Sequence, residues 1–216
     1  MNNKWIENID IYCERLAPGL FAEPLNAITN FSFFIAAFFL FRLAKSKKYF
    51  DHRSFILIGL IVIIGAGSTF FHTLATYWAM LSDQIPILLF QIAFLIFYAR
   101  GVMRLSRLGT CLMLAAFFAS IYIFGSLPRE WLNGSLAYAP AFLILGGLGF
   151  WHWFYAQRER GALLLAMAVF AVSLTFRSLD MTLCPALPAG LHFLWHILNG
   201  TVLYLTVRAY LLNANR

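Results

Sequence analysis

Two histidines lie one helical turn apart near the start of the last apolar stretch of this chain, in the segment His192-Phe193-Leu194-Trp195-His196. Residues four apart share one face of a helix, with Cβ atoms about 5–6 Å apart, so both imidazoles can reach one ion. A third histidine, His72, ends another apolar stretch. Ionisable side chains at membrane depth are costly and usually serve a function. Because imidazole nitrogen suits zinc, the three histidines predict a zinc site.

The predicted chemistry of this site is hydrolysis. A catalytic zinc keeps three protein ligands and one water, lowers the pKa of that water to about 7, and polarises a carbonyl. Ser68 lies one turn before His72 and is placed to donate a hydrogen bond to an oxyanion. Asp83 is placed to hold the water and accept its proton. The structural alternatives are a small helix-packing residue for Ser68 and a helix N-cap for Asp83.

The composition predicts that an all-α membrane domain positions these residues. The 216-residue chain is 62% hydrophobic and 12% charged, whereas soluble domains are about 45–50% apolar and 25% charged. Its net charge of +7 comes from Lys and Arg residues in short connections, not from a clustered basic patch. We therefore expect an integral membrane protein with no nucleic-acid partner.

Seven apolar stretches are long enough to span a membrane, which takes about 20 residues each. The expected helices are Leu25–Leu43, Phe55–Ala75, Asp83–Met103, Leu108–Phe124, Tyr138–Tyr155, Ala162–Ser178 and Leu191–Leu212. They define a membrane domain at 25–212, preceded by an extracytoplasmic arm at 1–24 and followed by a short cytoplasmic tail at 213–216. The arm has no apolar segment of the kind found in a secretory signal peptide.

The distribution of positive charge predicts the orientation, because cytoplasmic connections are enriched in Lys and Arg. The first, third and fifth connections carry most of these residues, and Arg208 and Arg216 lie at the C-terminal end. This alternation places the N-terminus outside and the C-terminus in the cytoplasm. On this topology the three histidines, Ser68 and Asp83 all fall at the level of the outer leaflet. The basic residues are Arg42, Lys45, Lys47, Lys48 and Arg53 in the first connection, Arg100, Arg104 and Arg107 in the third, and Arg158 and Arg160 in the fifth.

Several short segments carry a resemblance that covers nearly the whole chain. They are Tyr12-Cys13-Glu14, Ala22 to Asn26, Thr29-Asn30, Gly65 to His72, Asp83-Gln84-Ile85-Pro86, Phe176 to Asp180, and His192 to His196. In their order and spacing the chain resembles the alkaline ceramidases, seven-helix membrane hydrolases related to the adiponectin and progestin receptors, and a bacterial member in particular. The resemblance implies a zinc amidase that cleaves ceramide or a related N-acyl lipid to a fatty acid and an amine. It places Ser68, His72, Asp83, His192 and His196 at the family's site positions.

The resemblance also implies a second metal, because eukaryotic relatives bind calcium through acidic residues of the arm. Glu14 and Glu23 match that pattern, and Asp10 is the third candidate ligand. Ile11 and Leu16 stand where oxygen ligands are expected and depart from the pattern.

Two cysteines lie on the predicted outer side, Cys13 in the arm and Cys184 in the sixth connection. An oxidising compartment allows a disulfide between them, and this bond would hold the arm over the helices. If the protein is bacterial, it belongs in the inner membrane with its site facing the periplasm.

The sequence leaves other interpretations open. A retinal protein needs a Schiff-base lysine in its last helix, and no Lys follows Lys48, which excludes that class. A receptor or transporter with a structural zinc has the same helix pattern and remains an alternative. Asp180 either orients a ligand imidazole or pairs with Arg177, one turn earlier. The oligomeric state does not follow from the sequence.

Overall fold

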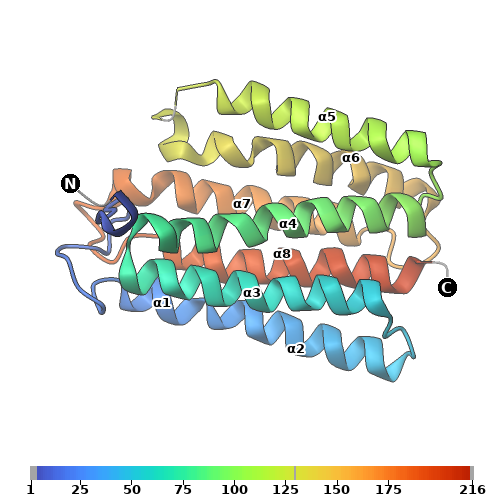
Figure 1. Ribbon diagram of the computed structural model, residues 1–216, viewed down its shortest axis with the longest axis horizontal. Helices are drawn as coiled ribbons and strands as arrows, with labels where there is room; N and C mark the ends of the chain where they lie inside the picture. Colours follow the sequence, from blue (N-terminus) through green and yellow to red (C-terminus); the bar gives the residue numbers. More distant parts are fainter. Residues whose placement is uncertain (1–3, 129, 215–216) are drawn as a thin grey trace.

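Long helices running side by side form one bundle in the computed structural model, which describes residues 4–128 and 130–214 (Figure 1). The described chain contains no β-strand beyond one isolated bridge between Asn8 and Thr76. The α-helices are α1 (Pro24–Thr29), α2 (Phe31–Ser46), α3 (His52–Leu74), α4 (Tyr77–Gly101), α5 (Arg107–Gly125), α6 (Ala139–Tyr155), α7 (Ala162–Leu183) and α8 (His192–Asn213), and the 3-10 helices are η1 (Lys4–Ile6) and η2 (Trp131–Tyr138). The predicted all-α architecture is confirmed.

Two helices, α4 and α7, extend furthest beyond the bounds predicted from their apolar stretches. α4 begins at Tyr77 after the N-cap Thr76, so Asp83 lies in its second turn and is not the N-cap. α7 continues to Leu183, beyond the expected end at Ser178. Both extensions carry polar side chains that lower the local hydropathy, although the helical hydrogen bonds continue through them. Because Asp83 lies within the helix, its carboxylate is not a capping group and can face the bundle interior.

Six helical segments within the described residues are long and apolar enough to span a membrane, and α8 is long enough but more polar. α8 packs against α1, α2, α3, α4 and α7 and lies in the middle of the bundle (Figure 1). Its central position explains its composition, because neighbouring helices enclose its polar side chains. α5, by contrast, packs on the outside against α4 and α6. The bundle therefore surrounds the helix that carries the histidine pair.

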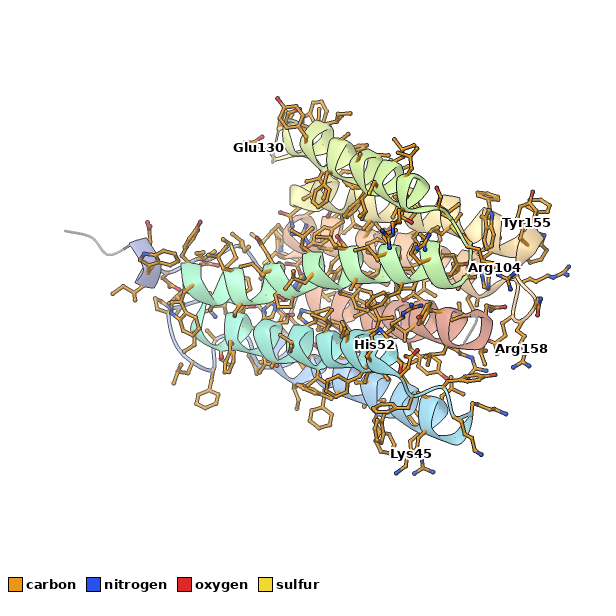
Figure 2. The ribbon with its side chains drawn as sticks, turned by 45° about the vertical axis from the view of Figure 1, so that its right-hand side comes forward. Lys45, His52, Arg104, Glu130, Tyr155 and Arg158 are labelled. Carbon is orange, nitrogen blue, oxygen red and sulfur yellow. A yellow bond between two sulfur atoms is a disulfide. The ribbon has the colours of Figure 1, made fainter. Side chains whose placement is uncertain are left out.

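Basic residues from three connections gather at one end of the bundle. Lys45, Arg104 and Arg158 lie toward the end at which α8 finishes, and Glu130 lies toward the other (Figure 2). The arm lies at the end opposite the end of α8 (Figure 1). Arg216, which entered the charge pattern, lies outside the described residues, as do residues 1–3 of the predicted arm, residue 129 and residue 215 of the predicted tail.

Two glycines let helices approach closely beside the histidines. A Cβ atom on Gly67 of α3 would lie 2.0 Å from the carbonyl oxygen of Ser82 in α4. A Cβ atom on Gly200 of α8 would lie 2.8 Å from the hydroxyl of Ser32 in α2. Both distances are too short for a real side chain, so only glycine permits these crossings. The crossings bring α3, α4, α2 and α8 together around one point.

Covalent and polar contacts hold the arm against this end of the bundle. Cys13 and Cys184 form a disulfide with a Cα–Cα distance of 5.4 Å. The backbone N–H of Ile9 donates to the Ala75 carbonyl in the turn between α3 and α4. The buried carboxylate of Asp180 accepts hydrogen bonds from the backbone N–H groups of Cys13 and Leu191. The arm is therefore part of the folded structure and covers this end of the bundle.

Candidate metal centre

Three imidazoles converge where the arm meets α3 and α8. One ring nitrogen from each of His72, His192 and His196 lies within 4.8 Å of the others, and all three residues are buried. His72 comes from the last turn of α3, and the other two come from the first two turns of α8. Within the described residues, this is the group of His, Cys, Asp and Glu side chains close enough together to hold a metal ion. The structure thus gathers the three histidines that the sequence predicted as ligands.

Hydrogen bonds leave the Nε2 atoms of two of these imidazoles free. The Nδ1 atom of His72 lies 2.5 Å from the carboxylate of Glu23, which accepts a hydrogen bond from it. The Nδ1 atom of His196 lies 3.1 Å from the hydroxyl of Thr29. The same hydroxyl also donates to the Leu25 carbonyl, at 2.7 Å, which leaves its oxygen available to accept from His196. With Nδ1 bonded in this way, each ring has its Nε2 atom left for an ion, the arrangement typical of metal-binding histidines.

The third imidazole is held by stacking and through its backbone. The ring of His192 stacks on that of Tyr12 from the arm, with centroids 3.7 Å apart, and Asp180 accepts a hydrogen bond from its backbone N–H. Its buried Nδ1 atom has no hydrogen-bond partner in the described chain. A buried imidazole without partners is costly, and an ion bound by the ring would offset that cost. Three imidazoles are a donor set that fits zinc.

Ser68 and Asp83 lie beside the histidines at one end of an internal cavity. Both side chains line this cavity together with His196, and Asp83 interacts electrostatically with Ser68 and His72. The close crossing at Gly67 places these two residues of neighbouring helices next to each other. A hydroxyl donor and a carboxylate thus flank the position where an ion would be bound. The structure brings together the five residues predicted to form the site.

The cavity extends away from the histidines into the apolar interior of the bundle. Its walls come from α2, α3, α4, η2, α6, α7 and α8, and aliphatic and aromatic side chains predominate. His196 and Thr206 both line it, and their separation of ten positions along α8 corresponds to about 15 Å. A narrow apolar space of that length, with polar groups at one end, suits a hydrocarbon chain attached to a polar group.

Arg177 and Asp180 have separate partners. Arg177 donates to the Asn133 carbonyl and to the Ser135 hydroxyl, and its guanidinium stacks near the ring of Tyr138. Asp180 accepts only from backbone N–H groups in the hydrogen bonds found among the described residues. The residue therefore positions the start of α8 through the backbone. Asp180 thus has no bond to Arg177 among these contacts, and it holds the candidate ligand His192 through the backbone N–H of that residue and not through its imidazole.

The structure does not gather the three arm carboxylates expected to bind calcium. Asp10 is exposed, whereas both oxygens of Glu14 accept backbone N–H groups at the start of α1, and burial raises the pKa of Glu14. Glu23 is buried among other donors. Burial acts to raise the pKa of Glu23, but hydrogen bonds from His72, Asn26 and Arg15 outweigh it and hold the pKa below its usual range. The residues present do not fit a calcium site.

A family model described as Ceramidase matches residues 12–214 of the chain. The chain belongs to the ceramidase family. No curated protein matches it at the level of sequence. As a member of the ceramidase family, with six helices able to span a membrane, the protein is a multi-pass membrane hydrolase that acts on lipids. The match includes the arm from Tyr12 onward, so the arm residues that cover the candidate metal centre belong to the family domain.

Sequence reasoning did not assign roles to several residues that contact the ligands. Tyr12 stacks on His192, Thr29 bonds to His196, and Glu23 was interpreted as a calcium ligand although it bonds to His72. All three lie in segments that carried the family resemblance. Their position in those segments was the available signal, but it did not reveal which imidazole each contacts.

Proposed function

We propose that this ceramidase-family protein is a zinc-dependent amidohydrolase that cleaves the amide bond of ceramide or a related N-acyl lipid. The observation that carries the proposal is the placement of three metal-binding imidazoles at the polar end of an apolar cavity about 15 Å long. The products are a fatty acid and an amine, such as a sphingoid base. The cavity length favours substrates with a long acyl chain over soluble amides.

His72, His192 and His196 would hold the ion. Zinc bound there supplies a Lewis acid for the amide carbonyl and hydroxide at neutral pH. Ser68 donates its hydroxyl proton in a hydrogen bond to the carbonyl oxygen as negative charge develops on it. Asp83 accepts the proton of the attacking water and passes it to the leaving nitrogen. Asp180 and Tyr12 keep His192 in place, and the cavity walls hold the acyl chain.

The location of the basic connections supports an orientation for this reaction. Lys45, Arg104 and Arg158 lie at the end of the bundle opposite the arm, and positive connections face the cytoplasm in most membrane proteins. The N-terminal arm and the metal centre therefore face outward, which in a bacterium is the periplasm. The disulfide between Cys13 and Cys184 agrees with this assignment, because disulfides persist in oxidising compartments.

The test is release of fatty acid from a panel of N-acyl lipids by purified, zinc-loaded protein in detergent. The wild type is expected to hydrolyse at least one member. The His196→Ala variant should lose both zinc and hydrolysis, whereas the matched control His52→Ala should lose neither, because His52 is exposed at the far end of α3. A wild type that binds zinc and cleaves no lipid in the panel would instead support the receptor or transporter alternative.

A further inference from the structure

Arg15 is a buried cation in the arm with an unusual set of acceptors. Its side chain is 1% exposed, and its Nε atom lies 2.6 Å from one carboxylate oxygen of Glu23. Its other nitrogens donate to the carbonyl oxygens of Gly19 and His72, at 3.4 and 3.3 Å. A buried guanidinium is tolerated when its donors are satisfied in this way, and arginine suits such sites because its planar group serves several acceptors at once.

These contacts connect Arg15 to both ends of one metal-binding residue. Glu23, which Arg15 holds through one oxygen, uses its other oxygen to bond the Nδ1 atom of His72. Arg15 also bonds the backbone carbonyl of the same histidine. Arg15 thus contacts the backbone of His72 directly and its imidazole through Glu23. Displacement of the guanidinium would free the carboxylate that sets the tautomer and orientation of the ring.

The guanidinium occupies the side of Glu23 that an arm-bound calcium ion would need. Calcium takes six to eight oxygen ligands at about 2.3–2.6 Å, but Glu23 already bonds to Arg15, Asn26 and His72. A divalent ion at this carboxylate would also lie beside the positive charge of Arg15. Both oxygens of Glu14 also have partners already, since each accepts a backbone N–H group at the start of α1.

We propose that Arg15 is a built-in cation that replaces calcium at Glu23, and that it acts as a positioning residue for His72 and its metal. The arm of this protein is then assembled without calcium. The inference rests on the metal-binding half of the proposed function. It does not depend on which lipid is cleaved or on whether hydrolysis is observed.

The first test needs no variant. Wild-type protein purified without chelators should contain far less than one calcium per chain by mass spectrometry of metals. After dialysis against calcium-free buffer, its thermal midpoint should be the same in about 10 mM CaCl2 as in MgCl2, a concentration above the dissociation constants of weak protein calcium sites. One calcium per chain, or a midpoint raised by CaCl2 alone, would overturn the proposal.

The second test measures zinc affinity by competition with a chelating dye, without substrate. Arg15→Ala should weaken zinc binding about 10- to 100-fold, the usual effect of losing an outer partner of a metal ligand. Arg15→Lys, which keeps the charge but not the three-way contact, should recover part of this loss. Arg208→Ala is the matched control, because Arg208 pairs with Glu159 at the other end of α8, and its affinity should equal that of the wild type.

The outcomes of the second test are separable. Unchanged zinc affinity in Arg15→Ala would overturn the positioning role. If Arg15→Ala does not fold, as judged by circular dichroism, the same criterion applies to Arg15→Lys. A wild type that binds no zinc would refute the proposed function itself, and a wild type that binds zinc but hydrolyses nothing would leave the Arg15 result standing.

Discussion

The crossing of α3 and α4 at Gly67 yields a prediction with a magnitude set by the structure. A Cβ atom at this position would lie 2.0 Å from the Ser82 carbonyl oxygen, and real Cβ contacts essentially never fall below 3.0 Å. In Gly67→Ala the two backbones must therefore separate by about 1 Å, since packed interiors do not absorb such overlap. Because Ser68 and Asp83 are the next residues on the two helices, their separation at the reaction site increases with the shift.

A displacement of about 1 Å at a catalytic group costs about a hundredfold in rate, and overpacking costs about 1–3 kcal/mol of stability. We therefore expect kcat/KM for an N-acyl lipid to fall about a hundredfold in Gly67→Ala. Zinc content should stay near that of the wild type, because the three imidazoles come from α3 and α8 and not from α4.

The control is Gly59→Ala in the same helix, where no atom lies within 4 Å of an added Cβ. This variant should keep full activity and gain up to about 1 kcal/mol of stability, because alanine favours helix over glycine. Fatty-acid release, metal content and thermal midpoint would be measured for both variants. Wild-type kcat/KM in Gly67→Ala would refute the argument that this crossing sets the geometry of Ser68 and Asp83.

Three further predictions concern the cavity, the arm and the opposite end of the bundle. Leu148→Phe fills part of the cavity wall and should lower kcat/KM for the longest acyl chains more than for short ones; equal loss at all chain lengths would contradict the placement of the acyl chain. Replacing Cys13 and Cys184 by Ser removes a crosslink that typically contributes about 2–5 kcal/mol, so the thermal midpoint should fall and the arm should become sensitive to limited proteolysis; unchanged values for both would count against the role of the disulfide. The hydrogen bond from Arg208 holds the pKa of Glu159 below its usual range. This partly exposed pair therefore stabilises the fold by about 0–1 kcal/mol at pH values above the unfolded pKa of about 4.3, and the contribution is lost as the pH falls. The small advantage of the wild type over Glu159→Gln in thermal midpoint should disappear on acidification, and an advantage that grew would contradict this prediction.

Hydropathy and histidine spacing predicted most of the architecture and singled out the three histidines that the structure brings together. Membrane-spanning helices can be recognised in the sequence as long apolar runs, because each backbone polar group must find its hydrogen-bond partner within its own helix. His192 and His196 can be recognised as a pair by their spacing of one helical turn, which is a local property of the sequence. α8 was predicted as a helix although it is the most polar of the long ones, since its histidines and Arg208 are spaced among apolar residues.

Contacts between distant segments could not be predicted in the same way. Glu23 and His72 are 49 residues apart, and a carboxylate in the arm matches a calcium ligand as well as a partner of an imidazole. The role of Arg15 depends on a long side chain that folds back toward α3, and no periodicity encodes that path. The start of α4 was missed for a local reason, because its first turn mixes polar and apolar residues and lowers the apparent hydropathy.

The disulfide between Cys13 and Cys184 has a consequence for how the protein is made. Its cysteines are separated by 171 positions in the sequence, which take about 10–30 s to synthesise at typical bacterial and eukaryotic rates. On the proposed orientation, the arm crosses the membrane before Asp180, Cys184 and His192 have been synthesised. The arm can therefore be crosslinked only after α7 has been made, and it can cover the candidate metal centre only after α8 has been made as well.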